Sequence, residues 1–228
     1  MSEIVEDYND GKISSAYVRD FFGVGKTKLE EHGYRLISLE ENAALRMLEG
    51  YESDITRKGN IVREGLVFIP SVLGGFLTKT PSFIEHPLEL KKYITTRGSN
   101  LTDEELDKSL VDSVKFSSES IPTDRFGEDP LTNFIFGKFS GDYGKFLKER
   151  GIRELILPSQ GRLSSKRKPS IRYLFFGGVD YYTGIDKWRG GNNNVEGGER
   201  SSLIGRNDLP LTASPKLSAR LRGIKGLK

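Results

Sequence analysis

The chain has 228 residues, of which 36% are hydrophobic, 10% aromatic and 29% charged, and its formal net charge is +3. This length and apolar content suffice for one large domain with a buried core and exclude a wholly disordered chain. Because the sequence contains no cysteine, disulfide bonds, thiolate metal sites and cysteine nucleophiles are excluded. Its two histidines, His32 and His86, cannot form a three-histidine zinc site. We predict no metal site, no cofactor and no catalytic residue.

The chain carries no pattern of a membrane or secretory segment. Its first residues, Met1 to Asp7, are acidic and lack the cationic and apolar regions of a secretory signal. The longest apolar stretch, residues 67–77, is interrupted by proline and glycine and is shorter than the roughly 20 residues that span a bilayer. We therefore expect no membrane span, and a location in the cytoplasm, the nucleus or a virion.

Charge is distributed unevenly along the chain. Residues 161–228 hold 14 Lys and Arg against 5 Asp and Glu, a net charge of +9, whereas residues 1–160 hold 21 against 27, a net charge of −6. Such polarity indicates a cationic segment that contacts a polyanion or an acidic neighbouring surface. Solvated surface of both signs is the alternative interpretation.

Helical patterns dominate residues 13–50. An apolar face predicts a first helix over about residues 14–22, which the glycines at positions 23 and 25 break, and a second short helix that ends at Gly33. Ser38-Leu39-Glu40-Glu41 has the form of a capping box, in which the serine and glutamate side chains bond each other's free amide groups. It predicts a third helix that follows directly.

Strands and helices follow one another irregularly beyond residue 60. We predict a strand at 61–69, a helix after Pro87, a capped helix over 102–116, a loop at 117–130, a helix at 143–150 and a strand at 154–157. The strongest hairpin pattern is at 171–182, where two aromatic-rich strands flank Gly177-Gly178. The predicted fold class is α+β, with a helical N-terminal region, a mixed middle, this aromatic hairpin and an extended C-terminal arm.

We divide the chain into two parts. Residues 1–187 form the predicted α+β body, with a helical subregion at 13–50, and residues 188–228 form a basic arm rich in Gly and Asn. An isolated segment of the arm's composition buries too little apolar area to offset an ordering cost of ~1–2 kcal/mol per residue. We expect the arm to become ordered on contact with a partner.

Two cationic stretches are the candidate contact sites for nucleic acid or a partner subunit, because their side chains can neutralise phosphates. One lies before the hairpin and the other at the C-terminal end: Arg162, Lys166, Arg167, Lys168 and Arg172, and Lys216, Arg220, Arg222, Lys225 and Lys228. Four aromatic residues are candidates for stacking on bases: Tyr173, Phe175, Tyr181 and Tyr182. The alternative interpretations are a solvated loop and tail for the cations and hairpin core for the aromatics.

Residues 14–33 have the rhythm of a helix-turn-helix, with Gly23 at the turn. Arg19 stands where a small residue is usual, and His32 where an apolar one is usual. Residues 1–60 also hold eight basic against twelve acidic residues, which disfavours contact with phosphates. A structural helical hairpin therefore competes with DNA reading as the interpretation of this segment.

The charge polarity and the few catalytic side-chain types predict a non-enzymatic structural or interaction component of a larger assembly, of viral or nucleoprotein type. Its cationic arm would contact nucleic acid or neighbouring subunits. Two alternatives stay open: a DNA-binding regulator that uses residues 14–33, and an enzyme whose carboxylate site is scattered along the sequence.

Overall fold

The computed structural model describes residues 4–9, 12–20, 22–57, 59–70, 72–81, 99–117, 120–157, 168–177, 185–187 and 201–206. Its strands are β1 (Ile4–Asn9), β2 (Lys12–Asp20), β3 (Arg35–Leu36), β4 (Asn60–Phe68), β5 (Gly75–Thr78), β6 (Ser99–Asn100), β7 (Ser113–Phe116), β8 (Ser120–Pro122), β9 (Glu154–Ile156), β10 (Ser170–Phe176), β11 (Ile185–Lys187) and β12 (Ser201–Arg206). Its helices are α1 (Phe22–Glu31), α2 (Leu39–Glu49), α3 (Asp54–Arg57), α5 (Asp103–Leu110), α6 (Pro130–Phe136) and α7 (Ser140–Glu149), with short 3-10 turns η3 (Thr123–Arg125) and η4 (Gly137–Phe139).

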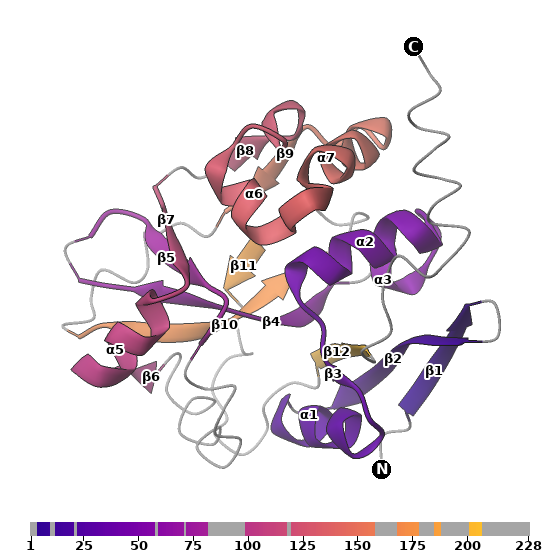
Figure 1. Cartoon of the computed structure of the whole chain (residues 1–228), viewed down its shortest axis with the longest axis horizontal. Coiled ribbons are helices and arrows are strands. Elements are labelled where there is room, and N and C mark those ends of the chain that lie inside the picture. Colours follow the sequence, from indigo (N-terminus) through magenta and orange to yellow (C-terminus); the bar gives the residue numbers. More distant parts are fainter. Residues whose placement is uncertain are drawn as a thin grey trace.

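A mixed sheet is the framework of the fold, which confirms the α+β class (Figure 1). Its main path runs β1-β2-β12-β4-β10-β11, with β3 paired to β12, β5 to β4, β7 to β5 and β6 to β10. Strands β12 and β4 pair in parallel, and all other adjacent strands of this path pair antiparallel. Strands β8 and β9 form a separate two-stranded sheet.

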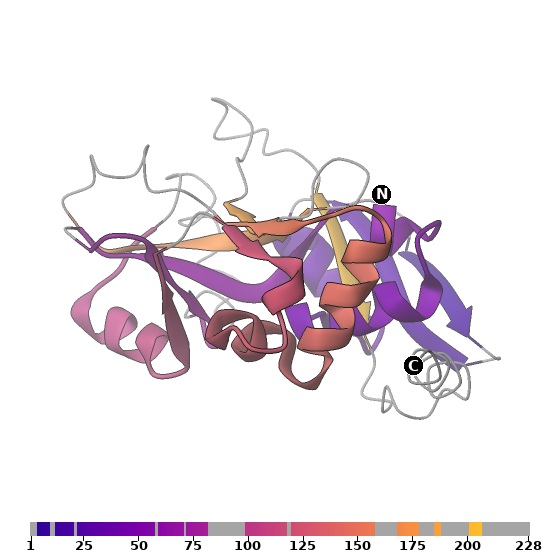
Figure 2. The same cartoon turned by 90° about the horizontal axis from the view of Figure 1, so that it is seen from above.

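Hydrophobic residues pack on both faces of β4, because successive side chains of a strand point to opposite sides. Val62, Leu66 and Phe68 belong to a larger cluster, which includes side chains of α2, α6 and α7. Ile61 and Val67 belong to a smaller cluster with residues of α1, β2 and β12. Figure 2 shows α6 and α7 together on one side of β4 and β10.

Elements with strong local signals form as predicted. Helix α2 begins with the complete capping box of Ser38 and Glu41, and α5 begins with a second capping box of Thr102 and Glu105. Strands β4 and β9 match the predicted strands, and α7 is followed by Gly151 at φ +76°. The helix predicted after Pro87 lies outside the described residues.

The first predicted helix is wrong, because residues 12–20 form strand β2. This strand pairs with β1 on one side and β12 on the other, so its backbone groups are bonded by long-range partners that local spacing cannot reveal. The glycines expected to break a helix lie inside α1. A Cβ at Gly25 would come 2.9 Å from Leu203 Cδ1, so the glycine lets α1 approach β12 closely. The end of α1 before Gly33, at φ +79°, is confirmed.

Three later predictions need correction. Helix α5 ends at Leu110, and residues 113–116 form β7 because they pair with β5. The predicted loop at 117–130 contains β8 and η3, since β8 pairs with β9. Strand β10 is where the hairpin was predicted, but the strand that returns along it is β11 at 185–187, and β4 is its partner on the other side.

Residues 201–206 fall in the segment expected as an arm, yet they form β12 inside the main sheet. Leu203 and Ile204 are both buried, one in each hydrophobic cluster. These six residues therefore belong to the body. The remainder of residues 188–228 lies outside the described part of the chain.

Two glycines of α7 provide a matched test of the packing between α7 and η3. A Cβ at Gly144 would lie 2.3 Å from the backbone oxygen of Thr123, whereas one at Gly141 would meet only Gly127 Cα, at 3.6 Å. Gly144→Ala should lower the free energy of unfolding by about 1–3 kcal/mol through overpacking. Gly141→Ala should raise it by up to about 1 kcal/mol through helix propensity. Urea unfolding measures both, and equal effects would contradict the close contact.

Candidate functional site

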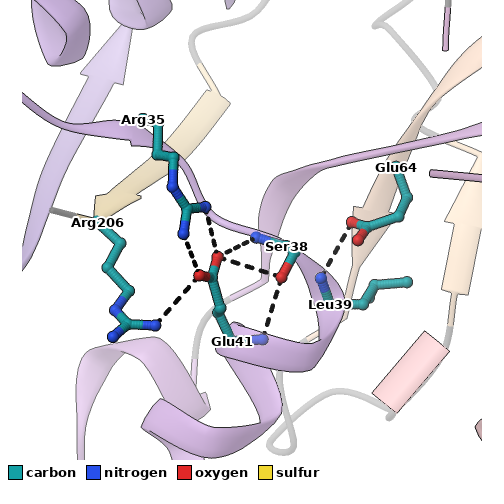
Figure 3. Close-up of polar contacts among 6 residues, drawn as sticks. All are labelled: Arg35, Ser38, Leu39, Glu41, Glu64 and Arg206. Carbon is teal, nitrogen blue, oxygen red and sulfur yellow. Dashed lines mark hydrogen bonds and ion pairs between the residues drawn. The ribbon is translucent and has the colours of Figure 1, made fainter. Parts of the chain in front are cut away.

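Buried polar groups gather at the beginning of α2 (Figure 3). The Ser38 backbone N–H donates to Glu41 Oε2 at 3.1 Å, and the Glu41 backbone N–H donates to Ser38 Oγ at 3.2 Å. The next free amide of the helix, that of Leu39, donates to Glu64 Oε2 of β4 at 3.0 Å. Free amides at a helix N-terminus need such acceptors. The hydrogen bond to Glu64 therefore fastens α2 to the central strand.

Two arginines converge on the same glutamate. Arg35 of β3 and Arg206 of β12 are directly opposite each other in an antiparallel pair, where like charges repel. Glu41 lies between them and accepts Arg206 Nη1 at 3.1 Å on Oε1 and Arg35 Nη1 at 2.9 Å on Oε2, while Arg35 Nη2 also bonds Oε1. We call Arg35, Glu41 and Arg206 the ionic cluster. It ties β12 to α2, and its carboxylate offsets part of the repulsion between the paired arginines.

The ionic cluster stabilises the charged form of Glu41. Burial by itself raises the pKa of this carboxyl, but the hydrogen bonds from Arg35 and Ser38 and the charges of both arginines outweigh it. The net result is a pKa below the ordinary glutamate value. The cluster's contribution to stability is therefore present above the ordinary pKa and is lost as the pH falls through the lowered one.

The pKa of Glu64 is displaced in the opposite direction. The side chain of this residue of β4 is buried, and burial raises its pKa to about 7. The charge of Arg63 and the hydrogen bond from the Leu39 N–H lower the pKa but do not outweigh burial. The negative charge of Glu41 raises the pKa further. Two carboxyl groups near one helix end thus have pKa values displaced in opposite directions, because one has two arginines and the other is desolvated.

A second buried charge, Arg46, links α2 to α7 and to the end of β10. This guanidinium is fully buried, and its Nη1 donates to Tyr143 Oη at 3.2 Å and to the Gly177 carbonyl at 2.9 Å. Its carbon Cζ lies 4.1 Å from the centre of the Phe176 ring, a cation–π geometry. Burial raises the pKa of Tyr143 although Arg46 opposes the shift, so the phenol stays neutral. The contacts of Arg46 hold a helix layer against the sheet.

Some of the residues singled out from sequence lie in the described part of the chain. Lys168 is exposed immediately before β10, and Arg172 is half-buried within β10, opposite Leu66 of β4. Phe175 packs against the smaller hydrophobic cluster, which agrees with its alternative interpretation as core. The other candidates lie outside the described residues: Arg162, Lys166, Arg167, Lys216, Arg220, Arg222, Lys225, Lys228, Tyr181, Tyr182 and the side chain of Tyr173.

The segment with the helix-turn-helix rhythm does not have that structure. Its first half is strand β2, so α1 has no preceding helix to pack against as that motif requires. The lysines of α1 are engaged within the fold: Lys26 Nζ lies 2.5 Å from Glu30 Oε1, and Lys28 Nζ lies 2.9 Å from Asp20 Oδ2. Residues 14–33 therefore do not form the helix-turn-helix that the sequence suggested for reading DNA.

Among the described residues, no group of three or more His, Asp or Glu side chains is placed to hold a metal ion. No helix in the described ranges has both the length and the apolar character needed to cross a membrane.

Comparisons with known proteins find one similarity in structure. No family model matches the chain, and no curated protein matches it either. A solved structure described as "Accommodation of massive sequence variation in Nanoarchaeota by the C-type lectin fold" aligns with a TM-score of 0.59 and 16% sequence identity. The alignment covers 88% of this chain and 100% of that one. The fold is similar to the C-type lectin fold. At this identity the likeness concerns the fold alone.

Sequence reasoning missed the buried charges Glu64, Arg46 and Arg206. A charged residue is ordinarily assigned to the surface, because an isolated buried charge is costly. One usable signal was the place of Glu64 in the apolar run of β4, between Val62 and Leu66 on the same face. The partners of Arg46 and Arg206 are far away in sequence and left no local signal.

Glu64 should make stability depend on pH between about 4.5 and 7. The unfolded chain releases this proton first, so the free energy of unfolding falls by up to roughly 3 kcal/mol as the pH rises through that range. Glu64→Gln keeps an acceptor for the Leu39 amide and should remove this component. Urea unfolding of both proteins from pH 4 to 8 measures the difference. A difference that is constant with pH would contradict the assignment.

Removing the carboxylate of the ionic cluster should cost more than removing one of its arginines. Glu41→Gln leaves Arg35 and Arg206 facing each other and should lower the free energy of unfolding by roughly 3 kcal/mol. Arg206→Met leaves the pair of Arg35 and Glu41 intact and should cost about 1 kcal/mol. The reverse order, measured by chemical unfolding at pH 7, would show that Glu41 does not offset the repulsion between the two arginines.

Proposed function

We propose that the protein is a non-enzymatic interaction component of a larger assembly, of viral or nucleoprotein type. The cationic residues that follow β12 in the sequence contact a polyanion, either nucleic acid or the acidic surface of a neighbouring subunit. Lys168, which precedes β10, and Arg172, within β10, are further candidate contacts with the polyanion.

One observation carries the proposal: the cationic C-terminal residues start from a fixed point. Arg206, the last described residue, is 7% exposed in its side chain and is held by Glu41. Five of the candidate cations, from Lys216 to Lys228, follow it within 22 residues. A body with net charge −6 over residues 1–160 thus carries a cationic segment tethered to its sheet. A tether raises the local concentration of the segment near whatever the body binds.

The similarity in fold supports an interaction role. The similar structure is described as a C-type lectin fold that accommodates massive sequence variation. A framework that keeps its shape while its sequence changes suits recognition, because surface residues can be exchanged without loss of the core. In this chain three of the buried charges in the described residues, Glu41, Glu64 and Arg46, bond framework elements to one another.

Of the two alternatives, the DNA-binding regulator is no longer supported, because residues 14–33 do not form a helix-turn-helix. The enzyme with a scattered carboxylate site stays a prediction. The displaced pKa values of Glu41 and Glu64 are the kind of signal that such a site gives. Both side chains are buried and bonded to the framework, which favours the structural interpretation of the pair.

Binding should depend on the C-terminal cations and on salt. We expect neutralisation of Lys216, Arg220 and Arg222 to glutamine to reduce the salt-dependence slope for duplex DNA by roughly 2–3, at about 0.9 per phosphate contact. The matched control neutralises three exposed cations of the body, Lys115, Lys148 and Arg153. Fluorescence anisotropy with RNA and DNA, and light scattering of the protein alone, separate nucleic acid from a subunit as the partner.

Equal effects of the two triple variants would contradict the proposed role of the C-terminal cations. A truncation that removes the same cations must spare residues 201–206, because β12 belongs to the main sheet. The suitable variant ends at Arg206. It should remain folded and lose its salt-dependent binding to the polyanion.

A further inference from the structure

The last described strand has an unusual position in the sheet. Strand β12 pairs with β2 over five residue pairs, from Ser201 opposite Asp20 to Gly205 opposite Ala16. On its other side it pairs with β4 through Leu203 and Ile61. In the described part of the chain, β12 is the strand that lies between the N-terminal strands and the rest of the main sheet (Figure 1). The space between β2 and β4 is therefore a slot for one strand.

The slot is fitted to the sequence of β12. Leu203 and Ile204 fill the two hydrophobic clusters on opposite faces of the strand. At Gly205 a Cβ would lie 2.7 Å from Tyr34 Cβ and 2.8 Å from Leu29 Cδ2, so the slot accepts glycine there. Arg206 completes the ionic cluster. A strand with two apolar residues, then glycine and then arginine meets these requirements.

A second copy of the chain supplies such a strand. Residues 188–200 connect β11 to β12, and 13 residues can span up to roughly 45 Å when extended. This connection contains four glycines and three asparagines. If β12 enters the slot of another copy, each of its contacts is reproduced, and the two chains exchange identical elements.

We propose that assembly of this protein proceeds by exchange of β12 between copies, each strand filling the slot between β2 and β4 of its partner. The inference rests on the proposed function, because it names the contact by which the assembly is built. Exchange carries the cationic residues after Arg206 onto the neighbouring copy, whose residues 1–160 have a net negative charge. The contacts in the slot are the same in the monomer, where β12 fills its own slot, and in the exchanged assembly. The protein concentration and the length of the connection, residues 188–200, therefore decide which of the two is populated.

The absence of cysteine makes a disulfide test direct. Arg19 and Ser202 are opposite each other on β2 and β12, and the double variant Arg19→Cys/Ser202→Cys, oxidised as a dilute monomer, has β12 locked in its own slot. Light scattering at increasing concentration should then show a monomer, whereas the reduced form assembles like the wild type. The control lock, Ser120→Cys/Ile156→Cys, joins β8 to β9 away from the slot and should not affect assembly.

A second arm of the experiment detects exchange itself. The single variants Arg19→Cys and Ser202→Cys are unfolded together, refolded, oxidised and digested. Peptide mass spectrometry should show a disulfide that joins positions 19 and 202 of different chains. Assembly by the locked form, or no such link in the mixture, overturns strand exchange and leaves the proposed function standing. A wild type that neither assembles nor binds nucleic acid contradicts both.

Discussion

A strand from the last part of the chain lies between a strand from its first twenty residues and the central strand β4, and much of the fold depends on that insertion. Without β12, strand β2 would lose its paired strand on one of its two edges, and β4 would lose its link to the N-terminal strands. An unpaired strand edge is a liability in a folded protein. The main sheet is therefore completed by contacts of very long sequence separation, which form slowly in folding.

The ionic cluster fixes where this insertion ends. Because β3 and β12 place two arginines opposite each other, their pairing needs a negative charge, and the capping glutamate of α2 provides it. One carboxylate thus caps a helix, bonds two arginines and holds the end of β12. The same contact gives the cationic C-terminal residues a fixed starting point, which links the electrostatics of the core to the proposed role in assembly.

Local signals were sufficient for some elements and insufficient for others. The capping boxes of α2 and α5 and the glycine after α7 act within a few residues, so sequence analysis predicted these helices. Strand β2 was predicted as a helix because its apolar spacing fits both structures and β1 and β12 decide between them. Strand β12 is short and follows a stretch rich in Gly and Asn, and its partners are about 140 and 180 residues away. Glu64 and Arg46 were missed for the same reason, since their bonding partners are distant in sequence.

Hydrogen exchange tests most directly whether β12 holds the sheet together. Two chains are compared, one ending at residue 206 and one at residue 200. The account predicts that amides of β2 are protected in the first chain and exchange rapidly in the second, while amides of α7 keep their protection in both. Equal protection of the β2 amides in the two chains would contradict it.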